Sequence, residues 1–399
     1  MVQTLPAALR SVLHRDVPLA PLTSLGLGGR ARFLVDARDG VTVAEALRWA
    51  RAESVPAALL AGGSNVVVAD AGFEGLVVRM VQRGIDRRRA PGPAGRSGAE
   101  LWTAAAGEPW DPLVERTVAG GLAGLECLSG IPGTAGATPI QNVGAYGREV
   151  AEVVESVRVL ERSTLEEGSL PPGECGFAYR DSVFRREPER FVVLAVTLRL
   201  APGAPAPVRY GELERALARD VAPGEMTGTR GAGGGAGKAP SKAGGPTLEE
   251  VRRAVLVLRR SKSMVLDGGD PNRRSVGSFF VNPVLPAREA DAVVDRAVAA
   301  GLARDPSEVP RFEAEPGRAK LAAGWLVERA GFPRGTRRGP VGVSSRHALA
   351  LVHHGGGTTA DLLALAREIR GAVQERFGVV LRPEPVFVGF GGADPLADG

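Results

Sequence analysis

Apolar runs of two kinds alternate along the chain and predict a mixture of short strands and helices. The runs at 58–60, 66–68 and 341–343 are short and continuous, which is typical of buried strands. Across 43–53 and 359–377 the apolar positions recur at the spacing of a helix with one buried face. The same reasoning predicts strands at 32–36, 76–81, 101–106, 153–161, 190–200, 348–352 and 379–381, and helices at 248–260, 287–300 and 321–330. The pattern predicts a fold of the α+β or mixed α/β class.

Local signals mark one helix start and two loops. Thr247 followed by Glu250 forms a capping box at the beginning of the helix expected at 248–260. The segments 90–98 and 222–246 are rich in glycine, proline and alanine and contain almost no large apolar residue. We therefore expect both to be loops, and the longer one to be a flexible insertion.

Composition excludes several functional classes. No apolar run approaches the roughly 20 residues of a membrane helix, and charges are scattered through residues 1–16, unlike a secretory signal. The net charge is +5, but the basic residues are spread along the chain with no aromatic partners, so we expect no nucleic-acid partner. Cys127 and Cys175 have no metal-ligand spacing and are expected to be buried thiols. We expect a cytoplasmic protein that has no membrane anchor and no metal.

Two glycine-rich segments carry the candidate chemistry. Leu60-Ala-Gly-Gly-Ser-Asn-Val66 predicts a tight turn whose backbone N–H groups can approach an anion closely. The segment 126–147 is longer, and its apolar residues argue against disorder. Loops of this length in compact domains are usually functional. A backbone so rich in glycine can line an elongated ligand, with Gln141 and Asn142 available for hydrogen bonds.

At this point the sequence resembles a known family. Ser129-Gly-Ile-Pro-Gly133 followed by Pro139-Ile-Gln-Asn-Val-Gly-Ala-Tyr-Gly147 looks like the flavin-binding signature of the UDP-N-acetylenolpyruvoylglucosamine reductases, in the subgroup that has the tyrosine loop. Ala61-Gly-Gly-Ser-Asn65 looks like their pyrophosphate-binding turn. Further matches in the family's order are Thr23–Gly29, Cys175–Phe184, Tyr210–Leu213, Ser278–Pro283, Leu321–Leu326 and Arg382–Glu384.

The resemblance implies an FAD-binding domain of the vanillyl-alcohol-oxidase/PCMH type, made of two α+β subdomains, and a C-terminal α+β substrate-binding domain. Subdomain 1 is expected at 1–84, joined by 384–399. Subdomain 2 is expected at 85–262 with the insertion 222–246, and the substrate-binding domain at 263–383.

By the same resemblance, NADPH reduces FAD, and FAD then reduces UDP-N-acetylglucosamine enolpyruvate to UDP-N-acetylmuramate for peptidoglycan synthesis. Hydride addition to this substrate pushes negative charge onto its carboxylate, so a fixed cation and an acid should face it. Arg180 fits the cation because its planar fork matches a carboxylate. Glu384 is the expected acid, because burial favours a protonated carboxyl, and Ser278 is the expected proton donor. A monomer is expected.

The remaining site residues follow from the motifs they match. Tyr179, Tyr210, Lys262 and Asn282 are expected to bind substrate, Lys262 as a point charge for phosphate. The cofactor is expected to contact Ala61, Gly62, Gly63, Ser64, Asn65, Ser129, Gly130, Ile131, Pro132, Gly133, Gly136, Ala137, Pro139, Gln141, Asn142, Gly144, Ala145 and Tyr146.

Alternatives stay open for the single residues and for the whole chain. Arg180 could instead form a surface salt bridge with Asp181, and Ser278 and Glu384 could be ordinary strand-end residues. Val281 stands where the family often has lysine, so any phosphate contact from that lysine is missing. The chain could also be another flavoprotein of the same fold, or a nucleotide-sugar binding protein without flavin.

Overall fold

The computed structural model describes residues 6–91, 98–208, 210–219, 245–392 and 394–397. The two expected loops, 90–98 and 222–246, lie largely outside these ranges. The chain divides into two compact units. Unit 1 comprises Met1–Asp36, Glu45–Arg79 and Lys262–Gly399, and unit 2 comprises Ala37–Ala44 and Met80–Ser261. The expected three-domain division within these units stays a prediction.

Unit 1 contains an N-terminal sheet with strand order β1-β2-β5-β3, in which β3 and β5 are parallel. The helix α1 (Gly40–Ala52) follows β2, and its first residues are assigned to unit 2. The strands β4 and β21, which are far apart in the sequence, pair in parallel. The bounds of these strands are β1 Leu13–Pro18, β2 Arg30–Ala37, β3 Ala57–Leu60, β4 Val66–Val68, β5 Phe73–Met80 and β21 Val386–Val388.

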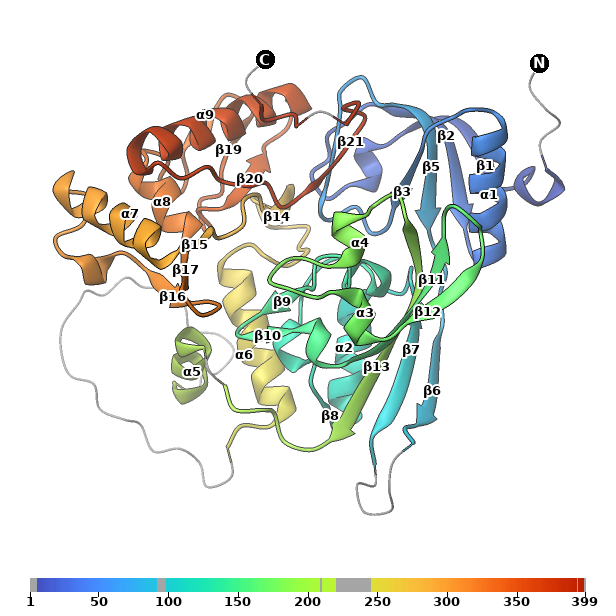
Figure 1. Ribbon diagram of the computed structural model, residues 1–399, viewed down its shortest axis with the longest axis horizontal. Helices are drawn as coiled ribbons and strands as arrows, with labels where there is room; N and C mark the ends of the chain where they lie inside the picture. The colour runs from blue at the N-terminus through green and yellow to red at the C-terminus, as the bar shows by residue number, and fades with distance from the viewer. Residues whose placement is uncertain (1–5, 92–97, 209, 220–244, 393, 398–399) are drawn as a thin grey trace. The chain divides into compact units, whose positions relative to one another are not determined.

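The C-terminal part of unit 1 has two further sheets, with orders β14-β20-β19-β18 and β15-β17-β16. The helices α7 and α8 each pack on α9, and α7 and α9 contact these sheets (orange to red in Figure 1). A capping box of Thr358 and Asp361 begins α9, and Gly378 ends it at φ 69°, a backbone conformation that glycine adopts without strain. The bounds are β14 Ser275–Ser278, β15 Val284–Pro286, β16 Arg311–Glu313, β17 Arg318–Leu321, β18 Arg337–Arg338, β19 Val341–Val343, β20 Ala350–His353, α7 Ala287–Ala299, α8 Ala323–Arg329 and α9 Thr359–Phe377.

Unit 2 is built on a sheet of order β12-β11-β13-β7-β6, with β8 paired to β13. Helices α2 and α6 pack together beside the segment that contains the expected flavin signature. As predicted, Thr247 and Glu250 cap α6 reciprocally. The bounds are β6 Ile85–Arg89, β7 Glu100–Ala105, β8 Leu122–Ala123, β9 Gly144–Ala145, β10 Arg148–Glu149, β11 Val154–Glu161, β12 Glu167–Leu170, β13 Phe191–Pro202, α2 Trp110–Ala119, α3 Pro172–Cys175, α4 Val183–Arg186, α5 Gly211–Ala218 and α6 Leu248–Ser261.

Two predicted elements are wrong in position. The run 379–381 forms no strand; Val379 and Leu381 are buried and Val380 is 53% exposed, but the strand that pairs is β21, five residues further on. Leu321 ends β17, so the helix expected from that residue begins at Ala323. Both boundaries are set by hydrogen bonds to other strands: β21 pairs with β4, and β17 pairs with β15 and β16.

Candidate functional site

The expected pyrophosphate turn, residues 61–65, connects β3 to β4 and is pressed against the N-terminal motif. Gly63 has φ 63°, and a Cβ atom at this position would lie 2.0 Å from the carbonyl oxygen of Leu22. The carbonyl of Gly63 accepts a hydrogen bond of 3.0 Å from Ser24 N. The turn therefore requires glycine and is held close to the segment that resembles the family's N-terminal motif.

The same turn contacts the expected catalytic acid. Asn65 Nδ2 donates to the carbonyl oxygen of Glu384 at 3.4 Å, and Val386 N donates to Asn65 O at 3.0 Å. Glu384 N in turn donates to Phe279 O at 2.8 Å. Unit 1 thus brings Glu384 next to the turn and next to the residue that follows Ser278. Both Ser278 and Glu384 are partly exposed, as a group that meets a ligand must be.

In unit 2 the segment that resembles the flavin signature is anchored at several points. Trp110 Nε1 donates to Leu128 O at 3.1 Å, and Ser129 Oγ donates to Glu126 O at 2.7 Å. Gly136 lies so close to Ala106 that a Cβ at position 136 would be 2.5 Å from the Ala106 Cβ. The loop is therefore a fixed part of the fold, which suits a preformed ligand site.

Asn142 is the most tightly held side chain of this segment. It is 1% exposed, and its Nδ2 donates to Glu149 Oε2 at 2.6 Å and to Ala178 O at 3.0 Å. Its Oδ1 accepts from Ala151 N at 3.1 Å. This amide joins the glycine-rich loop to Ala178, next to Tyr179 and Arg180, and the expected cofactor contact of Asn142 stays a prediction.

Three non-glycine residues of the expected site have a left-handed backbone: Asn142 at φ 41°, Tyr146 at φ 52° and Arg180 at φ 53°. This conformation costs free energy for a residue other than glycine, and such residues cluster at ligand sites. Here all three belong to the segments that match the family signatures. The observation supports a functional role for these segments.

Arg180 has the surroundings expected of a ligand-binding cation rather than of a partner for Asp181. Its Nη2 donates to Gly144 O at 2.6 Å, and its guanidinium carbon lies 5.6 Å from the ring centre of Tyr179. The Asp181 carboxylate pairs with Arg186. Tyr146 and Tyr210 pack edge to face with ring centres 5.4 Å apart, so an expected cofactor residue and an expected substrate residue meet here.

A buried cation that the sequence analysis missed lies in this group. Arg259, on α6, is 9% exposed. Burial lowers the pKa of Arg259 to about 10, Tyr146 and Asp111 act to raise it, and the neighbouring charge of Arg180 acts to lower it. Burial also raises the pKa values of Tyr146 and Tyr210. Two nearby guanidiniums favour an anionic ligand. In the sequence, the sign of this buried cation was that Arg259 stands on the helix face formed by Leu248, Val251 and Val255.

Asp111 and Arg252 were also missed. Arg252 Nη1 and Nη2 donate to the two carboxylate oxygens of Asp111 at 2.6 and 3.1 Å, and Gly130 N donates to Asp111 Oδ1 at 2.6 Å. Burial acts to raise the pKa of Asp111, but the bonds from Arg252 and Gly130 outweigh it, and the net shift is downward. This carboxylate is therefore ionised and bonded to the flavin-signature loop.

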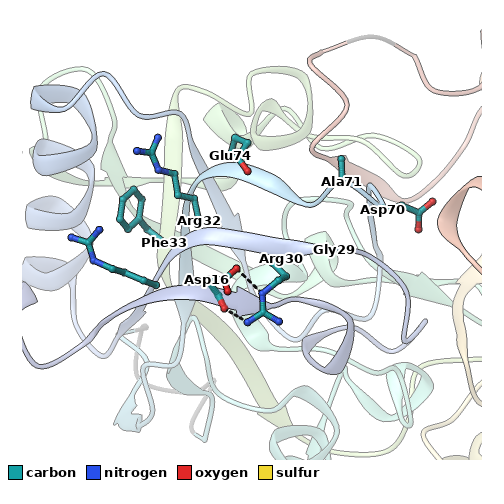
Figure 2. Close-up of a pocket in the computed structure, with 9 residues that line it drawn as sticks. Asp16, Gly29, Arg30, Arg32, Phe33, Asp70, Ala71 and Glu74 are labelled. Atoms are coloured by element: carbon teal, nitrogen blue, oxygen red, sulfur yellow. Dashed lines mark hydrogen bonds and ion pairs between the residues drawn. The ribbon is translucent and has the colours of Figure 1, made fainter.

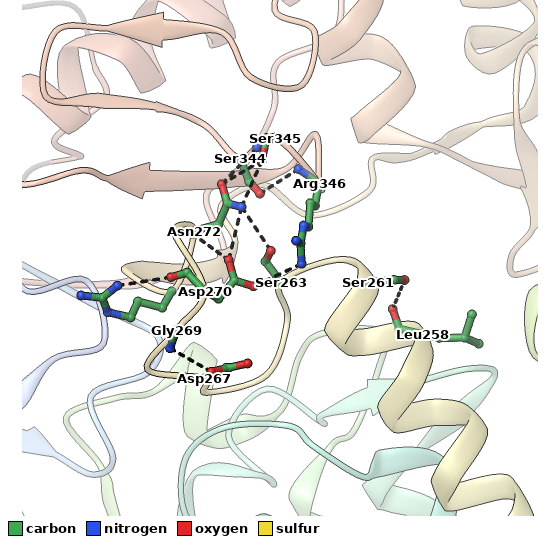
Figure 3. Close-up of polar contacts among 11 residues, drawn as sticks. Leu258, Ser261, Ser263, Asp267, Gly269, Asp270, Asn272, Ser344, Ser345 and Arg346 are labelled. Carbon is green, nitrogen blue, oxygen red and sulfur yellow. Dashed lines mark hydrogen bonds and ion pairs between the residues drawn. The ribbon is translucent and has the colours of Figure 1, made fainter. Parts of the chain in front are cut away.

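The segment after Lys262 is fixed by a buried polar network in unit 1 (Figure 3). Asn272 is 3% exposed; its Nδ2 donates to Ser263 Oγ at 3.2 Å and to Ser345 Oγ at 3.1 Å, and its Oδ1 accepts from Ser345 N at 3.1 Å. Asp270 accepts from Asn272 N at 2.8 Å. The network holds the residue next to Lys262 in a defined place.

Asn282 is expected to bind substrate. Its Oδ1 accepts a hydrogen bond of 2.9 Å from Ala323 N, at the beginning of α8. Its amide nitrogen is the group that a substrate could use.

Cys127 and Cys175 are buried free thiols, as predicted. Within the described ranges no cluster of acidic, histidine and cysteine side chains could hold a metal ion. No helix in the described part of the chain is long and apolar enough to span a membrane.

A surface depression of about 500 Å³ lies elsewhere in unit 1 (Figure 2). Its polar groups include the ion pair of Arg30 Nε with Asp16 Oδ1 at 2.6 Å, and Asp70, which accepts from the first N–H groups of α9. The guanidiniums of Arg15 and Arg32 lie 5.1 Å from the ring centre of Phe33. None of the expected site residues lines this depression.

Comparison with known proteins defines first the class of the protein. Residues 31–164 match the FAD binding domain model, a range that includes the turn at 61–65 and the loop at 129–147. Together with the α+β fold, this identifies an FAD-dependent oxidoreductase and confirms the predicted fold class. Residues 270–388 match the C-terminal domain of UDP-N-acetylenolpyruvoylglucosamine reductase.

The chain belongs to the UDP-N-acetylenolpyruvoylglucosamine reductase family. It is 43% identical over 390 residues to the enzyme of that name from Streptomyces avermitilis, covering 96% of this chain and 98% of the relative. It is 46% identical over 391 residues to that from Nocardia farcinica, covering 97% and 93%. The solved structure of the Thermus caldophilus enzyme is 24% identical and has the same fold, with a TM-score of 0.58 over 94% of this chain and 98% of that one.

Proposed function

We propose that this protein uses NADPH to reduce UDP-N-acetylglucosamine enolpyruvate to UDP-N-acetylmuramate in peptidoglycan precursor synthesis. The observation that carries the proposal is the full-length similarity to reductases of that name, which spans both the FAD-binding and the C-terminal segments. The structure fits FAD at two places: a turn where Gly63 leaves no room for a side chain, and a preformed glycine-rich loop. We also propose that it acts as a monomer in the cytoplasm.

We propose that the turn at 61–65 and the loop at 129–147 hold FAD, which when bound carries a hydride from NADPH to the methylene carbon of the enolpyruvyl group. Arg180 binds the substrate carboxylate and stabilises the negative charge that develops there. Its bond to Gly144 O holds the guanidinium before substrate arrives. Arg259 adds positive charge to the same part of unit 2.

In unit 1, Ser278 is the proposed donor of the proton that the carbon next to the carboxylate receives. A serine is a weak acid, so it can act only on a strongly basic carbon placed beside it. Glu384, held through Phe279 O and Asn65, is the proposed acid that helps to neutralise the developing charge. We propose that Tyr179, Tyr210, Lys262 and Asn282 bind the nucleotide-sugar part of the substrate.

The direct test is to purify the protein, record its visible flavin spectrum, add NADPH without oxygen and then add the enolpyruvate substrate. The proposal predicts bound FAD that NADPH bleaches and the substrate restores, with UDP-N-acetylmuramate as product. A colourless protein would contradict flavin binding. A flavin that NADPH bleaches but the enolpyruvate does not reoxidise would favour the alternative of an FAD enzyme for another small molecule. Size-exclusion chromatography tests the monomer, and cell fractionation tests the location.

A further inference from the structure

Trp110, the first residue of α2, holds both ends of the loop segment 129–133. Trp110 N donates to Gly133 O at 3.1 Å and Trp110 Nε1 donates to Leu128 O at 3.1 Å. Between these two anchors Gly130 has φ 70°, and glycine populates positive and negative φ about equally. Something has to select the orientation of the peptide group at Gly130.

The Asp111 carboxylate bonds directly to the peptide group at Gly130. Its Oδ1 accepts from Gly130 N at 2.6 Å, and it comes from the first turn of α2. A charge-assisted hydrogen bond of this length is stronger than a bond between neutral groups. The carboxylate thus holds the peptide group at Gly130, which lies between the two residues bonded to Trp110.

A negative charge beside a loop that binds an anionic cofactor is unfavourable unless it is neutralised. Arg252, whose side chain is only 12% exposed, supplies the neutralising charge through two bonds of 2.6 and 3.1 Å. Such a forked pair fixes direction as well as charge. Arg252 lies on α6, the helix that also carries the buried Arg259 and ends just before Lys262.

We propose that Asp111 and Arg252 form a positioning pair for the FAD site: Asp111 orients the loop at Gly130, and Arg252 neutralises and aims that carboxylate from α6. Neither residue belongs to the motifs that assign the site. The proposal rests on the proposed function, because it requires that the loop at 129–133 contacts FAD. It predicts that the pair controls FAD affinity in a protein that is already folded.

The test measures the Kd for FAD by equilibrium dialysis of the holoenzyme for wild type, Asp111→Asn, Arg252→Met and the double variant. Arg252→Met leaves an uncompensated carboxylate against the loop, so we expect the Kd to rise roughly 10- to 100-fold, the range that loss of a charged hydrogen bond gives. Asp111→Asn keeps an oxygen for Gly130 N and should raise it less, about 10-fold. The double variant should bind FAD better than Arg252→Met alone, because the unpaired charge is gone.

The matched control is the pair of Arg199 and Glu155, which is also forked, with two bonds of 2.7 Å, and which joins two strands of the same unit. Glu155→Gln with Arg199→Met should change the Kd for FAD less than 2-fold, roughly, since neither side chain contacts the loop. Circular dichroism verifies that every variant compared is folded. If a variant does not fold, Arg252→Lys is measured in its place, because lysine keeps the positive charge but cannot make the two parallel hydrogen bonds. An intermediate Kd for FAD in Arg252→Lys supports the positioning pair, and an unchanged Kd overturns it.

The outcomes separate the two proposals. Wild-type Kd values in both Asp111→Asn and Arg252→Met, or a purely additive double variant, would overturn the positioning pair while leaving the reductase activity in place. A wild-type protein that binds no FAD at all would instead refute the proposed function, and with it the basis of this inference.

Discussion

Replacing Asn142 should destabilise the protein far more than a typical loop substitution. Asn142→Ala removes the bond to Glu149, worth about 1.5–3 kcal/mol because its acceptor is charged, and two bonds to backbone groups at about 0.5–1.5 kcal/mol each. Asparagine also tolerates the φ of 41° better than alanine does. Since water can re-enter part of the site, we expect a loss of about 3 kcal/mol in the free energy of unfolding.

Urea unfolding followed by tryptophan fluorescence measures this loss. Asn142→Asp is the matched variant because it keeps the shape and removes only the donor. At pH 8 it places a second carboxylate against Glu149 and should be at least as damaging as Asn142→Ala. Unfolding free energies within about 0.5 kcal/mol of wild type in both variants would refute the role assigned to Asn142.

Three further predictions concern other parts of the chain. Gly63→Ala should abolish FAD retention, because its Cβ would lie 2.0 Å from Leu22 O, and an unchanged ratio of flavin to protein would disprove this. Burial raises the pKa of the Cys127 thiol to about 12, from about 8.5 in the unfolded chain. The protonated thiol therefore contributes its full stability below about pH 8.5, and this contribution falls by about 1.4 kcal/mol per pH unit above it. The stability of wild type should approach that of Cys127→Ala as the pH rises to 10.5, and a constant difference would contradict the burial argument. Asn272→Ala should raise the KM for the nucleotide sugar roughly tenfold, because it loosens the segment after Lys262. The rate of flavin reduction by NADPH, measured separately, should not change. An unaltered KM would show that Asn272 does not position this segment for substrate binding.

The sequence predicted what depends on local chemistry. The capping box at Thr247, the helix at 359–377 and the strand at 341–343 follow from spacing and side-chain type alone, and the structure confirms them. The strand expected at 379–381 was wrong because strand formation needs a partner. The backbone that pairs with β4 is 386–388, and a run of apolar residues says nothing about which neighbour is free.

The candidate site shows the same division. The glycine-rich turn and loop are contiguous and carry recognisable motifs, so the sequence revealed them. Asp111 and Arg252 are 141 positions apart and neither stands in a motif, so only folding of α2 against α6 brings them together. Asn142 shows the opposite case: it stands in the motif, but its amide is used inside the protein.

The proposed reaction is tested by rapid mixing of the NADPH-reduced enzyme with UDP-N-acetylglucosamine enolpyruvate, for wild type and Ser278→Ala. NADPH should bleach the flavin at similar rates in both proteins, since Ser278 has no part in that step. Return of the flavin absorption should be fast in wild type and slower by roughly 10²–10⁴-fold in Ser278→Ala, the contribution typical of a positioned proton donor. Equal rates of flavin reoxidation in the two proteins would contradict the role of Ser278, and no reoxidation in wild type would contradict the proposed reaction itself.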